Sequence, residues 1–123
     1  MTTSITLYGI PNCDTVKKAR TWLQEQGIAF HFHDFKKDGL QRQTIQSWLP
    51  HVALDVLINR KGTTWRALSA QQKASAADTD QAIALMLAAP SIIKRPVLHI
   101  VDGGGTQGLS VGFSAQQYQT IFE

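Results

Sequence analysis

The residue best suited to chemistry in this sequence is its single cysteine, Cys13. It follows a turn-forming segment, residues 9–12, and precedes a segment whose apolar residues have helical spacing. We therefore expect Cys13 at a helix N-terminus, where unpaired backbone N–H groups and the positive end of the helix dipole stabilise a thiolate. The pKa of this thiol should then fall below the value of about 8.5 of a free cysteine. Lys17, one turn further on, should add to the effect, whereas Asp14 opposes it.

The alternative is that Cys13 is a small buried core residue, because free cysteine is among the most buried residue types. Its place at a turn, between Asn12 and Asp14, argues against deep burial and favours a reactive thiol. Val16 stands where the second thiol of a Cys-x-x-Cys motif would be. A redox cycle therefore needs an external thiol such as glutathione.

Two further segments carry positive charge at places where an anion could bind. Arg95 precedes Pro96 and an apolar strand pattern, so we expect an extended backbone that presents the arginine beside the thiol helix. The sequence leaves the isomer of this X-Pro bond open, and an ordinary surface arginine is the alternative. Residues 59–66 hold three cations, Arg60, Lys61 and Arg66, which suit an oxyanion or carboxylate. A solvated basic loop explains that segment equally well.

No metal site is expected. His31 and His33 alternate on one face of a predicted strand, but no nearby carboxylate or thiol completes a ligand set, so we interpret them as surface residues. Asp78 and Asp80 are placed to cap a helix rather than to act as a catalytic pair.

Composition narrows the function further. The chain has 123 residues, 12 Lys and Arg against 9 Asp and Glu, and a pI near 9.3. Because the basic residues are scattered, we expect a small anionic or disulfide substrate rather than nucleic acid. No apolar stretch is long enough to span a membrane, and the N-terminal residues lack the pattern of a secretory signal. These features predict a cytoplasmic protein, and we expect a monomer that holds no bound cofactor.

The elements that must position Cys13 follow from the hydrophobic pattern. Residues 5–9 alternate as a strand, a helix runs on to Gly27, and residues 28–35 alternate again. Short helical patterns fill residues 37–89, and a hairpin and a final helix follow, with Leu109, Val111 and Phe113 predicted on the inward face of the second hairpin strand. The order β-α-β, helices, β-β-α predicts an α/β thioredoxin-like fold with a central helical insertion, in one domain over residues 1–123.

Three segments taken together resemble one family, the arsenate-reductase-related (ArsC) proteins. They are residues 7–19 (LYGIPNCDTVKKA), 60–66 (RKGTTWR) and 90–97 (PSIIKRPV). Within that family the chain looks most like the YffB branch, and it is similar to the regulator Spx. The resemblance covers nearly the whole chain and again implies a thioredoxin-like fold with a helical insertion.

The resemblance also implies roles. Cys13 matches the nucleophile of arsenate reductases, whose reaction glutathione completes, and Arg60 and Arg95 match two of the three arginines around the oxyanion. Asn12, Lys17 and Pro96 border these positions in the matching motifs and are further candidates for binding substrate or glutathione. The third arginine has no counterpart, because residues 105–109 read GTQGL and no arginine follows Arg95.

Three functions therefore remain open. The first is a glutathione-dependent thiol reductase in which Cys13 attacks a disulfide or an oxyanion and glutathione resolves the adduct. The second is an Spx-like module that binds a protein complex and does not need Cys13, although the redox cysteine pair of Spx is missing. The third is a true arsenate reductase in which Arg66 or Lys94 replaces the missing arginine.

Overall fold

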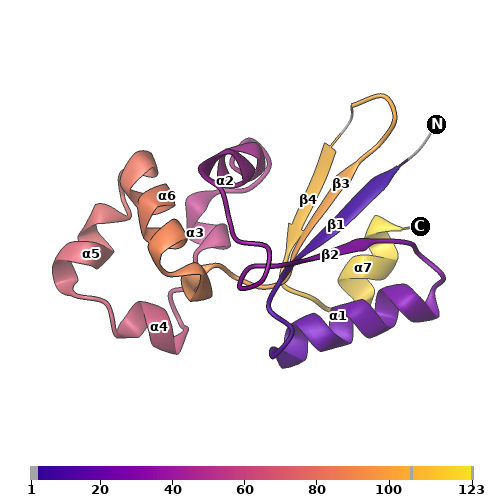
Figure 1. Ribbon diagram of the computed structural model, residues 1–123, viewed down its shortest axis with the longest axis horizontal. Helices are drawn as coiled ribbons and strands as arrows, with labels where there is room; N and C mark the ends of the chain where they lie inside the picture. Colours follow the sequence, from indigo (N-terminus) through magenta and orange to yellow (C-terminus); the bar gives the residue numbers. More distant parts are fainter. Residues whose placement is uncertain (1–2, 106, 123) are drawn as a thin grey trace. The chain divides into compact units, whose positions relative to one another are not determined.

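The structure is a computed structural model that describes residues 3–105 and 107–122. Its residues form two compact units (Figure 1), one built from the chain up to Asp38 and from Arg95 onward, the other from Gly39–Lys94. The expectation of a single domain with an insertion over residues 37–89 stays a prediction.

The first unit is built on a four-stranded sheet in the order β2-β1-β3-β4. The central strand β1 (Ser4–Gly9) pairs in parallel with β2 (His31–Asp34) and antiparallel with β3 (Val97–Val101). Strand β3 then forms an antiparallel hairpin with β4 (Gln107–Val111). The predicted β-α-β and β-β-α order is confirmed, with α1 (Asp14–Glu25) and α7 (Ala115–Ile121) as its helices. Strand β2 is shorter than the predicted segment 28–35, because Ile28 still bonds to the end of α1.

Helices α1 and α7 lie on the same face of this sheet (Figure 1) and close its core. The helix α1 turns Val16, Ala19 and Leu23 inward and its charged residues outward, the amphipathic pattern of a surface helix. Leu7 and Leu98 of the sheet meet Leu23 and Tyr118 of the helices, and all four are fully buried. Burial of such apolar side chains, worth about 25 cal/mol per Å², holds α1 against the sheet.

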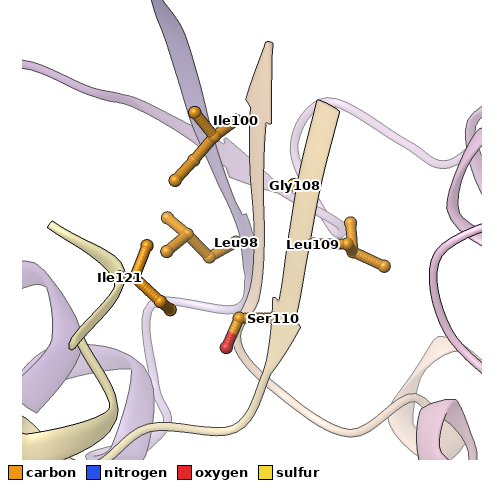
Figure 2. Close-up of a pocket in the computed structure, with 6 residues that line it drawn as sticks. All are labelled: Leu98, Ile100, Gly108, Leu109, Ser110 and Ile121. Carbon is orange, nitrogen blue, oxygen red and sulfur yellow. The ribbon is translucent and has the colours of Figure 1, made fainter. Parts of the chain in front are cut away.

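The prediction that Leu109 and Val111 lie on the inward face of the second hairpin strand, β4, is wrong. The register pairs Leu98 with Ser110 and Ile100 with Gly108, so Ser110 and Gly108 occupy the helix-covered face. Leu109 points to the opposite side of the sheet (Figure 2), and Val111 shares its parity. Because glycine and serine fill little space, an apolar pocket of about 140 Å³ remains beside Ile121. Phe113 reaches the core only because the chain turns at Gly112, whose φ is +75°.

Strand β1 and helix α1 approach each other closely at Gly9 and Val16. A Cβ atom added at Gly9 would lie 2.8 Å from Cγ2 of the buried Val16. We expect Gly9→Ala to lower the free energy of unfolding in urea by about 1–3 kcal/mol, the usual cost of overpacking. Gly108→Ala is the matched control, since that Cβ would meet no atom within 4 Å.

A double-mutant cycle tests the cause of this effect. Val16→Ala removes the atoms that the new methyl group would strike, so Gly9→Ala should cost markedly less in the Val16→Ala background than in the native one. An equal cost in both backgrounds would contradict the steric explanation.

Tyr118 makes stability depend on alkaline pH. Its side chain is fully buried, its hydroxyl has no hydrogen-bond partner among the described residues, and burial raises its pKa above the ordinary 10.0. Burial also raises the pKa of the half-buried Tyr8. The unfolded chain therefore releases these protons first, and the free energy of unfolding should fall as pH rises above 10.0.

Tyr118→Phe should make this fall shallower and, at neutral pH, leave stability unchanged or raise it by up to about 1 kcal/mol, because it removes an unsatisfied hydroxyl. Urea unfolding at several pH values measures both effects. A tyrosinate absorbance that appears in the native protein at the pH of free tyrosine would contradict the prediction.

The second unit is helical. Its helices are α2 (Arg42–Trp48), α3 (Leu54–Leu57), α4 (Thr63–Arg66), α5 (Ala70–Ser75), α6 (Thr79–Ala88) and the short 3-10 helix η1 (Pro90–Ile92). Side chains such as Trp48 and Met86 are fully buried within it. As predicted, Asp78 caps a helix, and its carboxylate accepts from the backbone N–H of Gln81 at 3.0 Å. In the described part of the chain, no helix has the length and apolar character needed to cross a membrane.

Candidate thiol site

Cys13 is the N-cap residue of α1. Its backbone is extended, with φ −141° and ψ 122°, and its carbonyl accepts from the N–H of Lys17 at 2.9 Å. The thiol makes no capping hydrogen bond, and the residue is half-buried. The sulfur therefore stands at the positive end of a 12-residue helix without being tied to its backbone.

The local sequence explains this placement. Strand β1 ends at Gly9, where the absence of a side chain lets Val16 pack against the strand. Pro11 favours a turn after the strand, and the amphipathic helix then begins at Asp14. The buried residues of α1 thus hold the helix against the sheet, while Cys13, at the N-cap, is only half-buried.

Arg95 and Pro96 lie at the same end of the sheet. The pairing of Tyr8 with Val97 places Pro96 beside Gly9, the residue from which the chain leads to Cys13. The Arg95–Pro96 peptide bond is cis, which settles the isomer that the sequence left open, and Pro96 is buried. The Pro96 carbonyl accepts from the N–H of Gly112 at 2.9 Å, which ties this corner to the end of β4.

Arg95 carries an unused hydrogen-bond donor. The residue is half-buried, and its Nε atom is buried without a partner among residues 3–105 and 107–122. A buried guanidinium N–H without an acceptor is costly, so the arrangement favours an anionic ligand that supplies one.

Asn12 and Lys17 are exposed on either side of Cys13. Lys17 lies in the first turn of α1, four residues after Cys13, and contributes a positive charge to that turn. Asp14, also in the first turn, opposes it, as the sequence indicates. Five of the predicted site residues therefore belong to one end of the first unit. They are Asn12, Cys13, Lys17, Arg95 and Pro96.

Arg60 belongs to the second unit. Its guanidinium forms an ion pair with Asp55 at 2.9 Å and lies over the ring of Trp65, 5.4 Å from its centroid. The sequence analysis did not single out Asp55, because a carboxylate five residues away in a short helix carries no motif. Arg66, the third cation of the basic segment, is exposed in α4.

The histidines differ in part from the prediction. His31 is exposed as expected, whereas His33 is half-buried and packs against Tyr8, with ring centroids 4.9 Å apart. His99 shares a hydrogen bond of 2.8 Å with Gln107. No group of three metal-ligating side chains occurs in the part of the chain that the structure covers.

Comparisons with known proteins agree with this architecture. A sequence model of the ArsC family matches residues 8–121. An uncharacterized protein of Haemophilus influenzae is 40% identical over 118 residues, covering 96% of this chain and 98% of that protein. Two solved structures are similar over nearly their whole length. One is a YffB protein, which is 44% identical with a TM-score of 0.86, and the match covers 98% of this chain and 100% of that chain. The other is an arsenate reductase related protein from Brucella melitensis, which is 47% identical with a TM-score of 0.71, and the match covers 98% of this chain and 95% of that chain. The α/β thioredoxin-like fold expected from the sequence is confirmed.

Proposed function

The chain belongs to the ArsC family, and from this premise we propose that it is a glutathione-dependent thiol reductase whose nucleophile is Cys13. The observation that carries the proposal is that two features lie at the same end of the first unit. One is a thiol at the N-cap of α1, and the other is the buried Nε of Arg95, which has no hydrogen-bond partner in the described part of the chain. Together they offer a nucleophile and an anion-binding donor.

The proposed reaction begins when the Cys13 thiolate attacks one sulfur of a disulfide that includes glutathione. The S–S bond breaks, Cys13 becomes glutathionylated, and the other sulfur leaves as a thiolate that takes a proton from solvent. The thiolate of a second glutathione then attacks the adduct, which releases oxidised glutathione and restores the Cys13 thiolate. Two electrons pass from the glutathione pool to the substrate.

The chain's own residues have defined parts in this cycle. The N–H groups at the start of α1 stabilise the thiolate, as they would any anion at a helix N-terminus. Arg95, with Asn12 and Lys17 beside Cys13, would hold a carboxylate of glutathione or the anionic substrate. Arg60 is the further candidate for binding the substrate anion. The proposal places the protein in the cytoplasm, where glutathione is available, and requires no bound cofactor.

A disulfide fits the proposed site better than arsenate does. Arsenate reductases of the family surround the oxyanion with three arginines, whereas residues 105–109 of this chain contain none. Thr106, within that segment, lies outside the described residues. Loss of one charged partner weakens the binding of a small oxyanion, while a disulfide needs no such ring of charge.

The proposal is tested by the rate of Cys13 alkylation with iodoacetamide against pH, with and without glutathione disulfide. Since the chain has one cysteine, all alkylation reports on Cys13. We expect a half-maximal rate at a pH below about 8.5, the value for free cysteine, and loss of alkylation after treatment with glutathione disulfide. A midpoint at or above the free value, with no adduct formed, would make Cys13 structural and favour the protein-binding alternative.

Two neighbouring lysines provide a matched pair for this experiment. Lys17→Gln removes a positive charge one turn from Cys13, and we expect alkylation at neutral pH to slow about two- to threefold. Lys18→Gln makes the same change at the next exposed position of α1, directed elsewhere around the helix, and should leave the rate nearly unchanged. Equal slowing by both changes would indicate a general charge effect rather than a local one.

A further inference from the structure

The second unit contains an open pocket of about 340 Å³ whose charged lining residues are Arg60, Lys61, Lys94 and Asp55. All four residues lie within Gly39–Lys94, so the pocket is complete inside one unit. Three cations and one carboxylate leave it strongly positive. The pocket is also the place where two segments distant in sequence, residues 55–61 and residue 94, are brought together.

The backbone holds these two segments in place. Ile58 and Ile93 form an antiparallel bridge, and both side chains are almost fully buried, at 2% and 1% exposure. The N–H of Lys94 donates to the Leu57 carbonyl, and the N–H of Asn59 donates to the Ile92 carbonyl, each at 2.7 Å. Lys94 is therefore anchored next to the Arg60–Lys61 turn by the fold itself.

The turn after Ile58 is also ordered. The side-chain oxygen of Asn59 accepts from the N–H of Lys61 at 3.2 Å, and its carbonyl accepts from the N–H of Gly62 at 3.3 Å. These bonds fix the direction in which the chain leaves the bridge, so Arg60 and Lys61 are presented together. Because these hydrogen bonds already hold the backbone of the turn, less conformational entropy is lost when a ligand binds the cations.

The ion pair between Asp55 and Arg60 shows that the pocket can hold a carboxylate. Its carboxylate lies 2.9 Å from the Arg60 guanidinium, the distance of a charge-assisted hydrogen bond. Both side chains are exposed, at 46% for Arg60 and 78% for Asp55, so water screens the pair and an external anion can compete with it. Lys61 and Lys94 have no ion pair among residues 3–105 and 107–122, and their charge is left for that anion.

We propose that Arg60, Lys61 and Lys94 bind a multiply charged oxyanion group, a phosphate or a dicarboxylate, and that Asp55 leaves Arg60 when the anion binds. Arg66, which the sequence grouped with these cations, has no part in this site. The inference deepens the proposed function and rests on it for its biological role, because Arg60 is one of the residues assigned there to the substrate anion. The sequence named Lys61 and Lys94 as separate candidates for binding an anion, whereas their grouping with Arg60 and the competing Asp55 comes from the pocket.

The test is a titration of the whole, isotope-labelled protein with inorganic phosphate and, separately, with malonate, followed by NMR of the backbone amides. We expect saturable shifts at residues 57–62 and 94, and the probe that saturates at the lower concentration identifies the preferred oxyanion. Lys61→Gln and Lys94→Gln should each weaken binding about three- to tenfold, whereas Asp55→Asn should tighten it by a similar factor. The absence of saturable shifts at these amides with both anions would overturn the proposal.

Lys73→Gln is the matched control, because it removes the same charge in the same unit at a residue outside the pocket. It should leave the binding constant within about twofold of the native value. A loss as large as that of Lys94→Gln would overturn the proposal, since it would show only a general attraction to positive charge. Cys13 alkylation separates this inference from the proposed function. Normal alkylation without pocket binding defeats the inference alone, and pocket binding with an inert Cys13 defeats the proposed function alone.

Discussion

A Cys13→Ser variant should lose glutathionylation and all glutathione-dependent disulfide reduction while its stability stays the same or increases. The first effect follows because a serine hydroxyl is not ionised at neutral pH and cannot form a disulfide. The second follows from the position of the residue. Cys13 is an N-cap whose side chain makes no capping hydrogen bond, and serine is among the preferred residues at that position.

The expected gain is up to about 1 kcal/mol in the free energy of unfolding, the usual value of a side-chain cap. Urea unfolding measures it, and mass spectrometry after incubation with glutathione disulfide measures the loss of the adduct. If Cys13 were a structural core residue, burial of a hydroxyl in its place would lower stability instead. A Cys13→Ala variant separates the two contributions, because alanine removes the thiol without supplying a cap.

Arg95 should control glutathione binding. We expect Arg95→Leu to weaken the affinity of the site for glutathione about 10- to 100-fold, the effect of one charge-assisted hydrogen bond to a carboxylate. The reason is that its buried Nε has no acceptor among the described residues, so a bound carboxylate would satisfy it. The concentration of glutathione that half-saturates reduction of the mixed disulfide measures the change.

Two further variants make the result specific. Arg95→Lys keeps the charge but loses the planar pair of donors, so it should recover only part of the affinity. Arg42→Leu removes an exposed arginine of α2 that is ion-paired with Asp80 in the second unit, and it should leave the half-saturating concentration unchanged. If Arg95→Leu binds glutathione as the native protein does, the anion-binding role assigned to Arg95 is wrong.

Local patterns were enough to predict most of the first unit. The alternation of residues 5–9 and the spacing of Val16, Ala19 and Leu23 are properties of the chain itself, and both reappear in β1 and α1. The position of Cys13 at the start of α1 follows from the same local signals, since a turn precedes it and an amphipathic helix follows it. The helix cap at Asp78 was predicted for the same reason.

Predictions that depended on pairing between distant segments were less successful. The apolar residues Leu109 and Val111 favoured an inward face, but the register with β3 places Gly108 and Ser110 on the helix-covered side. Strand β2 is likewise shorter than its alternating pattern. Only His31–Asp34 pair with β1, since the chain at Ile28 is still hydrogen-bonded to the end of α1. A one-residue choice of register reverses every side chain of a strand, and the sequence of the strand alone does not make that choice.

The sequence by itself therefore determined the type and order of the elements of the first unit and the place of its single thiol at a helix N-terminus. Tertiary structure alone decided the cis Arg95–Pro96 bond and the position of Lys94 beside the Arg60–Lys61 turn. It also decided that the buried Nε of Arg95 has no hydrogen-bond partner among the residues that the structure describes. The physical reason is distance along the chain. Periodicity and capping act within a few residues, whereas the surroundings of an arginine or a lysine are set by hydrogen bonds between segments more than thirty residues apart, such as Lys94 to Leu57.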